Sequence, residues 1–542
     1  MHWLVNPVSS QRPSRAVSSG QTAVNWGSGG NPYEISWTMI SEDRICTVVA
    51  AERSSEMSRQ LKQALRHTRT VELRLDWLPT DKDILAFLRR LAKTRLRATL
   101  IATCRRSGAG GQYRGTIANQ LLILAEAIRA GCAWCDLEIE SASKCPPEIL
   151  DVLLAGSRRI ASAHFFGASP ANWQRVLADL RSTNPDAIKI AATCDSLKAG
   201  LRLFRLARSK RNTVIIPMGD VVLPLRCLAL REGSSLCYAP VENATAPGQV
   251  SLTNAKELFR IDQITRKTSV YGVIGNPIAH SLSPQLQNAG FQARKINAVY
   301  FPFLVHDLRD FLAAVKPLGI RGFSVTLPYK RKILRYLDNC DPLAAAIGAV
   351  NTVVVRGSNK LYGYNTDYVG VLRALQERVI LARSRVLILG AGGSARAVAF
   401  ALAHSGASVC ICARRPEEAR KLARAVGGQA LSRTRLKTEF FDAIVNATPV
   451  GMYPQTARSP LAAHELNCRL VFDLIYRPFK TKLLQLAARR GIETVSGLEM
   501  FLAQGIAQWE IWTGQRAPAA AMRKAVLDAV RTSGKETFRA TP

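Results

Sequence analysis

The chain of 542 residues is 47% hydrophobic and 21% charged, an ordinary composition for a globular protein. Its length favours two to four domains, and no apolar run reaches the roughly 18 residues needed to span a bilayer. The net charge of +34 would suit a nucleic-acid binder, but the basic residues are spread along the chain without a zinc finger or an RNA-binding aromatic pattern. We therefore expect solvated basic faces and pockets for small anionic substrates, with neither nucleic acid nor membrane as a partner.

Residues 1–40 are rich in Ser, Gly, Asn and Pro, which predicts a disordered tail or a segment that precedes a true start at Met39. They lack the basic-then-apolar pattern of an export signal. The twelve cysteines are scattered through expected strands and helices, which is typical of reduced thiols in a cytoplasmic protein. Cys132 and Cys135 form a C-x-x-C, but no second pair lies nearby. We interpret them as core residues and predict no metal site.

From Ile45 onward, short β-branched runs alternate with stretches of helical period such as Asn119–Ala130. Eight runs within about 200 residues are what a (β/α)8 TIM barrel requires, and we place this α/β domain at 41–262. A helix near Asn254–Arg266 follows the last strand. The predicted strands are Ile45–Ala50, Val71–Leu75, Ala98–Thr103, Cys135–Ile139, Arg159–Ala163, Ala187–Ala191, Thr213–Pro217 and Leu236–Ala239.

Barrel enzymes carry their chemistry at the carboxyl ends of the strands. Lys189 is flanked by apolar residues on its strand, a setting that offers a free amine as a nucleophile. His164, one strand earlier, can move protons near neutral pH. Together they suggest imine chemistry on a ketone, although a lysine that extends its amine to the barrel rim is the competing interpretation. The side chains expected at these strand ends are Glu72, Arg74, Arg105, His164, Lys189, Met218 and Arg226.

Two further α/β units are predicted, at 268–375 and 380–497, followed by helices over 498–535. The third unit opens with the strand Val386–Leu389 and a glycine-rich turn that begins a helix. Such a turn receives a dinucleotide pyrophosphate on free backbone N–H groups. The residues of this turn are Gly390, Ala391, Gly392, Gly393 and Ser394.

The strand after this turn, Ser408–Cys412, ends in Ala413, Arg414 and Arg415. An NAD-specific fold usually has an acidic residue at this position. Two guanidinium groups suit a 2′-phosphate, so the sequence predicts NADP(H) as the cofactor. A pair of solvated arginines in a very basic protein is the alternative.

The unit at 268–375 carries four polar motifs whose order is the informative feature. A turn holds Ser281 and Ser283, and a strand ends in Thr326 and then Lys330. The remaining motifs are Gly348-Ala-Val-Asn351-Thr352 and Gly363-Tyr-Asn365-Thr366-Asp367. Each motif by itself fits a turn or a helix cap.

With these motifs, Val270–Gly514 resembles shikimate dehydrogenase throughout its length, including a substrate domain completed by the C-terminal helices and a Rossmann domain. The resemblance implies that Lys330 and Asp367 are the catalytic pair. The ammonium would polarise and protonate a ketone oxygen while hydride reaches its carbon. The implied substrate-binding residues are Ser281, Ser283, Thr326, Asn351, Tyr476 and Gln504. The implied cofactor contacts are Gly390, Ala391, Gly392, Gly393, Ser394, Arg414, Arg415, Asn446, Thr448, Leu474 and Gly497.

Three positions depart from the pattern of that family. Ser324 stands where many members have Asn, and Ala413 and Arg415 replace the Asn and Thr of its Asn-Arg-Thr cofactor motif. Arg414 remains, so phosphate recognition is expected to persist with a changed geometry.

The first domain, Ile45–Leu258, resembles type I 3-dehydroquinate dehydratase. The matching sequence segments are Glu72-Leu-Arg74, Thr103-Cys-Arg105, Gly110-Gly111-Gln112-Tyr113 and Ala246-Pro247-Gly248-Gln249. The resemblance implies that Lys189 forms a Schiff base with the C3 ketone and that His164 takes a proton from the neighbouring carbon and returns it to the departing hydroxyl. The implied pocket residues are Glu72, Arg74, Arg105, Arg226, Thr245 and Gln249.

One residue of that dehydratase pattern is missing. The family's Arg-x-x-x-Glu-Gly-Gly is Arg105-Arg-Ser-Gly-Ala109-Gly-Gly here, so the glutamate that partners the histidine is absent. Without it we expect His164 to be less well oriented and to bind a proton less tightly. Dehydration should be slowed but retained, and Glu138 is a candidate replacement.

The sequence therefore predicts a bifunctional enzyme that dehydrates 3-dehydroquinate to 3-dehydroshikimate and reduces the product to shikimate with NADPH. Tethering the two sites would raise the local concentration of the shared intermediate. One alternative is an active dehydrogenase behind an impaired or inactive barrel, and another is a preference for quinate. The sequence predicts no oligomeric state.

Overall fold

The computed structural model describes residues 40, 43–167, 170–208, 212–242 and 248–537. The predicted tail at 1–40 lies outside the described residues except for Ile40, and so does Thr245. Within the described part of the chain, no helix is both long and apolar enough to cross a membrane.

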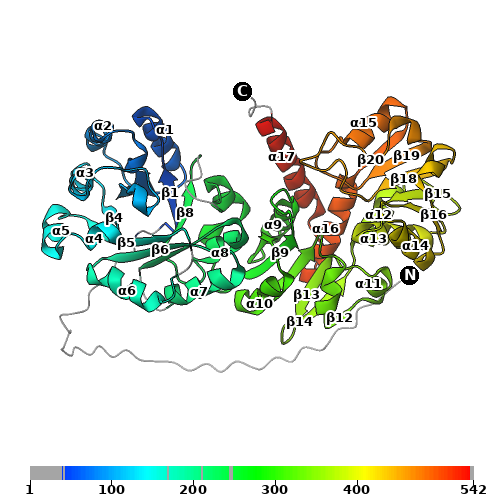
Figure 1. The fold of residues 1–542 in the computed structure, drawn as a ribbon, viewed down its shortest axis with the longest axis horizontal. Helices are drawn as coiled ribbons and strands as arrows, with labels where there is room; N and C mark the ends of the chain where they lie inside the picture. Colours follow the sequence, from blue (N-terminus) through cyan, green and yellow to red (C-terminus); the bar gives the residue numbers. More distant parts are fainter. Residues whose placement is uncertain (1–39, 41–42, 168–169, 209–211, 243–247, 538–542) are drawn as a thin grey trace, which may run out of the picture. The chain divides into compact units, whose positions relative to one another are not determined.

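Eight parallel strands form the first sheet, in the order β7-β6-β5-β4-β3-β2-β1-β8 (Figure 1). A hydrogen bond from Ser235 N to Thr213 O (3.0 Å) joins the two ends, so the barrel is nearly closed. All eight predicted strands are confirmed. They are β1 (Ile45–Val49), β2 (Thr70–Arg74), β3 (Thr99–Thr103), β4 (Trp134–Glu138), β5 (Arg158–Phe165), β6 (Ala187–Thr193), β7 (Thr213–Met218) and β8 (Cys237–Pro240).

Amphipathic helices cover the outside of this barrel (Figure 1). The helix over Asp81–Ala92 buries Ile84, Phe87 and Leu88. It begins where Thr80 Oγ1 accepts a hydrogen bond from Asp83 N. The helices are α1 (Ser54–Ala64), α2 (Asp81–Ala92), α3 (Ile117–Arg129), α4 (Ile139–Ala142), α5 (Pro147–Leu153), α6 (Trp173–Ser182), α7 (Leu197–Arg208) and α8 (Leu223–Leu228). The helix predicted near 254–266 is shorter than expected, because it is a π-helix at Asn254–Leu258 and a separate 3₁₀ turn at Ile261–Gln263 follows it.

The second sheet is mixed and has the order β10-β9-β11-β13-β14-β12. The strand β13 runs antiparallel to both β11 and β14. Its elements are β9 (Ser269–Gly275), α9 (Ser283–Ala293), β10 (Ala298–Leu304), α10 (Leu308–Leu318), β11 (Ile320–Val325), β12 (Asn339–Cys340), α11 (Pro342–Ile347), β13 (Thr352–Arg356), β14 (Lys360–Tyr364) and α12 (Asp367–Leu375).

The third sheet is parallel throughout, in the order β17-β16-β15-β18-β19-β20. Its order reverses beside β15, and ligands of open α/β sheets bind at such a switch point. Its elements are β15 (Arg385–Leu389), α13 (Gly393–His404), β16 (Ser408–Cys412), α14 (Pro416–Ala425), β17 (Gln429–Ala430), β18 (Phe441–Asn446), β19 (Cys468–Asp473), α15 (Lys482–Arg489) and β20 (Glu493–Ser496).

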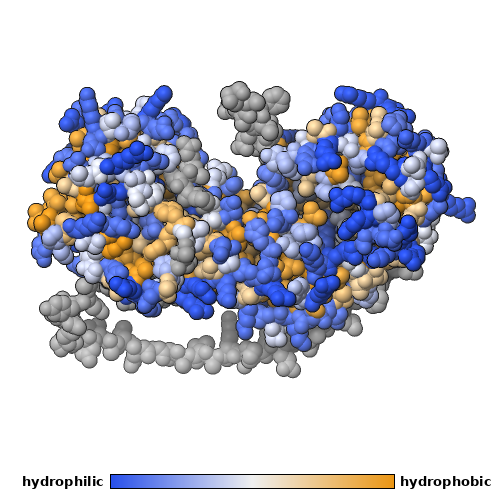
Figure 2. Space-filling view, viewed as in Figure 1, coloured by the Kyte–Doolittle hydropathy of each residue, from blue (hydrophilic) through white to orange (hydrophobic). Residues whose placement is uncertain are grey.

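Two C-terminal helices return to the second sheet's unit. The helix α16 (Gly497–Thr513) packs against α12, and α17 (Ala519–Thr537) packs against α9. The indole of Trp509 is fully buried between them in a shared apolar core. Hydrophilic side chains are spread widely over the face shown in Figure 2 and do not gather in one patch.

Candidate active sites

A small cavity of about 60 Å³ lies at the carboxyl ends of the barrel strands. The structure brings together there all the pocket residues predicted from the sequence that it describes. Phe166 and Tyr238 also line the cavity, and the sequence interpretation missed both. The predicted residues in its wall are Glu72, Arg74, Arg105, His164, Lys189, Met218, Arg226 and Gln249.

The amine of Lys189 lies between two carboxylates. Lys189 is 3% exposed, and its Nζ donates to Glu72 Oε1 (2.9 Å) and to Asp136 Oδ2 (2.8 Å). The residues that flank Lys189 on its strand are apolar as predicted, but the sequence did not predict these charged partners. Strands β2 and β4 supply them from across the barrel.

Asp136 is the centre of this charged group, and sequence reasoning missed it. Its Oδ1 accepts hydrogen bonds from Arg105 (2.9 Å) and Ser162 (2.5 Å). Burial would raise the pKa of Asp136, but the charges of Lys189 and Arg105 outweigh burial and hold the pKa well below its usual range. Asp136 therefore stays ionised and can balance the positive charge of the site.

The surroundings of His164 favour the neutral form of its imidazole. The guanidinium of Arg105 contacts both ring nitrogens. Burial and the positive charges of Arg105 and Lys189 lower the pKa of His164 well below its usual range. A neutral imidazole can accept a proton, so His164 is suited to act as a base.

Glu138 makes its hydrogen bonds through one carboxylate oxygen. Its Oε1 accepts from Gln120 Nε2 (2.9 Å), Arg106 N (3.2 Å) and Ser141 Oγ (3.4 Å). Its Oε2 is buried without a hydrogen-bond partner among the described residues. The replacement of the absent carboxylate by Glu138 therefore stays a prediction.

Arg226 is a buried cation without a partner for most of its guanidinium. It is 4% exposed, and its Nε and Nη1 atoms have no hydrogen-bond partner within the described residues. Burial lowers its pKa. An unpaired buried charge is costly unless an anion compensates it, so this side chain is suited to bind a substrate carboxylate.

Tyr238 faces the same lysine from β8. Nζ of Lys189 lies 4.1 Å from the centre of the Tyr238 ring, and the phenol oxygen is buried without a hydrogen-bond partner in the described residues. The ring face attracts a cation at this nitrogen. The sequence of β8, Cys-Tyr-Ala-Pro, gave no signal of this role.

A second cavity, of about 280 Å³, lies between the second and third sheets. Every substrate-binding residue predicted for this half lines it, together with both members of the predicted catalytic pair. The lining residues among these predictions are Ser281, Ser283, Thr326, Lys330, Asn351, Asp367, Tyr476 and Gln504.

Lys330 and Asp367 form a close ion pair in this cavity. Lys330 Nζ donates to Asp367 Oδ2 (2.6 Å), and Asn351 Nδ2 donates to Asp367 Oδ1 (2.8 Å). The loop after β11 carries the lysine, and the first turn of α12 carries the carboxylate. Since both carboxylate oxygens are engaged, the carboxylate is fixed and holds the ammonium at the cavity wall.

A buried chain of polar groups supports the floor of this cavity. The hydroxyl of Tyr300 donates to Ser324 Oγ (2.6 Å), which donates to Gln508 Oε1 (2.7 Å). Gln508 in turn donates to the backbone of Asn351 (3.1 Å). Sequence reasoning noted Ser324 only as a departure and missed Tyr300 and Gln508, because each sits in an apolar segment that looks like core.

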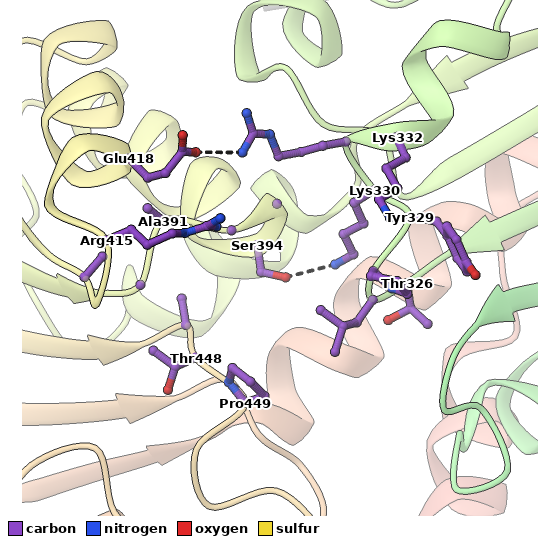
Figure 3. Close-up of a pocket in the computed structure, with 18 of the residues that line it drawn as sticks. Thr326, Tyr329, Lys330, Lys332, Ala391, Ser394, Arg415, Glu418, Thr448 and Pro449 are labelled. Atoms are coloured by element: carbon purple, nitrogen blue, oxygen red, sulfur yellow. Dashed lines mark hydrogen bonds and ion pairs between the residues drawn. The ribbon is translucent and has the colours of Figure 1, made fainter. Parts of the chain in front are cut away.

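A larger cleft of about 940 Å³ adjoins this cavity (Figure 3). Gly390 has φ +108°, which only glycine adopts readily. The helix α13 begins at Gly393 without a side-chain cap, so its first N–H groups are available to an anion. The predicted cofactor residues in its wall are Gly390, Ala391, Gly392, Gly393, Ser394, Arg414, Arg415 and Thr448.

The remaining predicted cofactor residues occupy different positions. Leu474 and Gly497 line the smaller cavity. Asn446 is fully buried and lines neither space. Its Oδ1 accepts hydrogen bonds from Thr448 N and Oγ1, and its Nδ2 donates to Asp473 (2.9 Å). Asn446 thus supports the Thr448 loop, and a direct contact between Asn446 and the cofactor stays a prediction.

An ion pair joins two residues that line the cleft. Arg331, in the loop after β11, donates to Glu418 Oε2 of the helix α14 at 2.9 Å. Arg414 and Arg415 lie at the end of β16 in the same cleft and are suited to a 2′-phosphate. The residues present therefore fit a phosphorylated dinucleotide.

The described residues contain no group of three or more His, Cys, Asp or Glu side chains that could hold a metal ion. Cys132 and Cys135 are buried free thiols, and burial raises the pKa of each to about 12.

Family models match the chain in both halves. Residues 45–266 match type I 3-dehydroquinase, and residues 273–353 match the shikimate dehydrogenase substrate binding domain. Residues 385–475 match NADP oxidoreductase coenzyme F420-dependent, and residues 497–527 match the shikimate 5′-dehydrogenase C-terminal domain.

Several known proteins are similar. The chloroplastic bifunctional 3-dehydroquinate dehydratase/shikimate dehydrogenase of Arabidopsis thaliana is 34% identical over 94% of this chain and 87% of its own. Shikimate dehydrogenase (NADP(+)) of Moorella thermoacetica is 43% identical over 50% of this chain and 97% of its own. A solved shikimate 5-dehydrogenase of Thermus thermophilus, in complex with NADP(H) and shikimate, is 34% identical over 48% of this chain and all of that one, with a TM-score of 0.45.

The Arabidopsis relative matches nearly the whole chain, and each half contains a cavity lined by the residues predicted for it. The chain therefore belongs to the bifunctional 3-dehydroquinate dehydratase/shikimate dehydrogenase family.

Proposed function

We propose that the barrel dehydrates 3-dehydroquinate to 3-dehydroshikimate and that the second half reduces this product to shikimate with NADPH. The observation that carries the proposal is the pair of lysine sites. Lys189 is buried between two carboxylates beside a neutral histidine, and Lys330 is paired with Asp367 next to a glycine-rich dinucleotide turn.

The dehydration starts with imine formation at Lys189. The ammonium releases one proton to His164, and the free amine attacks the substrate ketone. The resulting hydroxyl takes this proton and leaves as water, so ammonium and ketone become iminium and water. Arg226, a buried cation with unpaired nitrogens, binds the substrate carboxylate during these steps.

The iminium withdraws electrons from the neighbouring carbon. Neutral His164 takes a proton from this carbon and returns it to the hydroxyl that leaves, which expels a second water and creates the double bond. Hydrolysis then releases the enone product and restores the ammonium of Lys189. Asp136 and Glu72 balance the positive charge of the lysine nitrogen throughout.

Reductive trapping tests the covalent step. We expect borohydride, added during turnover of dehydroquinate, to leave a stable adduct on the peptide that contains Lys189, read by mass spectrometry. The variant Lys189→Arg keeps a cation for Glu72 and Asp136 but forms no imine, so it should give no adduct. Wild-type enzyme that consumes dehydroquinate without an adduct would contradict the proposal.

A second candidate function is an active dehydrogenase behind an impaired dehydratase barrel. The observation that favours it is Ala109, which stands where the dehydratase family has a glutamate. Because the pKa of His164 is lowered from its ordinary value of 6.5, the base stays neutral and kcat/KM of dehydration should fall only well below pH 6.5. We expect Ala109→Glu to move this fall in kcat/KM, the acid limb of the pH profile, to higher pH, since a nearby carboxylate favours the imidazolium. It should also raise kcat roughly tenfold by orienting the ring.

The variant Ala109→Gln is the matched control, because it has the size of glutamate without its charge. It should leave the acid limb where it is in the wild type. If Ala109→Glu changed neither kcat nor the pH at which kcat/KM falls on the acid side, a side chain at position 109 would have no effect on His164.

The reduction uses Lys330 as the proton donor. NADPH, when bound, supplies the hydride to the carbonyl carbon. The ammonium of Lys330 polarises the ketone oxygen and donates a proton to it as hydride arrives. Asp367, fixed by Asn351, keeps the ammonium oriented and accepts a hydrogen bond from a substrate hydroxyl. Arg414 and Arg415 hold the 2′-phosphate.

We place the dehydratase at 41–262, the dehydrogenase substrate domain at 268–375 with 498–535, and the NADP-binding domain at 380–497. The placement of the sheets supports these limits. The partners are the small-molecule substrates, with neither nucleic acid nor membrane. A cytoplasmic location is part of the proposal, and the free thiols of the described cysteines support it.

A further inference from the structure

The ammonium of Lys330 donates hydrogen bonds to two residues, one in the unit built on the second sheet and one in the unit built on the third sheet. Asp367 Oδ2, in the first turn of α12, accepts at 2.6 Å. Ser394 Oγ, the second residue of α13, accepts at 3.0 Å (Figure 3). Ser394 lines both the substrate cavity and the cofactor cleft, so it stands where the two spaces meet.

An ammonium has three N–H donors arranged around the nitrogen. Asp367 and Ser394 engage two of them, and these are the acceptors that the described residues give Lys330 Nζ. Once two directions of a tetrahedral group are fixed, the third is fixed as well. The remaining N–H has no acceptor among the described residues, and Lys330 lines both the substrate cavity and the cofactor cleft.

The glycine-rich turn also packs against the aliphatic stem of the same lysine. A Cβ placed on Gly393 would lie 2.8 Å from Cβ and 3.3 Å from Cδ of Lys330. The absence of a side chain at Gly393 lets the backbone of the turn approach this closely. The turn thus packs against the methylene groups of Lys330, while Ser394 accepts a hydrogen bond from its ammonium.

We infer that Ser394 is a positioning residue for Lys330, through which the dinucleotide turn orients the proton donor of the reduction. This inference rests on the proposed role of Lys330. The alternative is that the Ser394 hydroxyl contacts only the cofactor. A positioning role predicts an effect of the hydroxyl on kcat, and a cofactor contact predicts an effect on KM for NADPH.

The variant Ser394→Ala removes the acceptor and leaves a residue that favours the helix. Because a hydrogen bond to a charged group is lost, we expect kcat for dehydroshikimate reduction to fall about tenfold, with KM for NADPH changed less than twofold. Activity should also begin to decline at lower pH as the solution becomes basic, since the ammonium form has lost an acceptor. The variant Ser394→Thr, which keeps a hydroxyl, should restore most of the rate.

A readout independent of turnover is the reactivity of the amine itself. Competitive acetylation with acetic anhydride, mapped by mass spectrometry, reports how readily the Lys330 amine is modified at each pH. In Ser394→Ala the pH at which Lys330 becomes reactive should move downward, with and without NADPH. The control is Ser405→Ala, the same change at the other end of α13, where the hydroxyl bonds only Ala401 O (2.9 Å). It should change neither readout.

An increase in KM for NADPH with unchanged kcat, pH profile and acetylation would overturn the inference and make Ser394 a cofactor contact only. Failure of the proposed function looks different, because Lys330→Ala would then reduce dehydroshikimate at the wild-type rate whatever residue stands at 394.

Discussion

NADPH consumption from dehydroquinate should stop in Lys189→Ala and resume as soon as dehydroshikimate is added. The first site then supplies nothing to the second, while the second still works. Loss of a covalent nucleophile should reduce dehydration on the order of 10⁴-fold or more. A coupled assay that follows NADPH absorbance, with each substrate added in turn, measures both halves in one sample.

Removal of Lys189 also leaves Glu72 and Asp136 buried without their cation, which destabilises the barrel. The variant Lys189→Arg avoids that loss of charge and should be equally inactive in dehydration. Lys144→Ala, on an exposed lysine of the same domain, should behave as the wild type. NADPH consumption from dehydroquinate that survives in Lys189→Ala would refute the imine mechanism.

Lys330→Ala should produce the opposite pattern. Dehydroshikimate reduction should fall by about 10²–10⁴-fold, the usual contribution of a positioned proton donor. Dehydroquinate should still be converted, and the unsaturated product should accumulate. Its ultraviolet absorbance and the absence of NADPH oxidation provide the two readouts.

Two checks separate a chemical effect at Lys330 from a structural one. NADPH binding, followed by fluorescence, should be retained because the guanidinium groups of Arg414 and Arg415 are untouched. Lys360→Ala, on an exposed strand position of the same sheet, should keep full activity. A Lys330→Ala enzyme with wild-type kcat would rule out this lysine as the proton donor.

The elements that position both sites could be predicted from the sequence. The barrel strands are short, largely buried segments that alternate with stretches of helical period, and all eight predicted runs proved to be strands. The glycine-rich turn was recognisable because its chemistry depends on consecutive residues. Lys330, Asn351 and Asp367 were recognisable from local motifs, and the structure places all three in one cavity.

The sequence was least informative about contacts made across the fold. The helix predicted near 254–266 ends early, as a π-helix at Asn254–Leu258, and a separate 3₁₀ turn follows at Ile261–Gln263. Glu138 bonds Gln120 and the backbone of Arg106 through Oε1, contacts that no local motif indicated. Asn446 is fully buried and bonds the backbone of Thr448, which its place in a cofactor motif did not predict.

The sequence by itself was enough to determine the fold class, to single out Lys189 and Lys330 as the proposed catalytic lysines and to reveal the missing glutamate at Ala109, because periodicity and short motifs are local properties of the chain. Only the tertiary structure decided what surrounds each lysine. Asp136 lies 53 residues from Lys189 in the chain, and Ser394 lies 64 residues from Lys330. Partners so distant meet only when strands close into a barrel or two sheets pack together, and their charges and hydrogen bonds then set the chemistry of each amine.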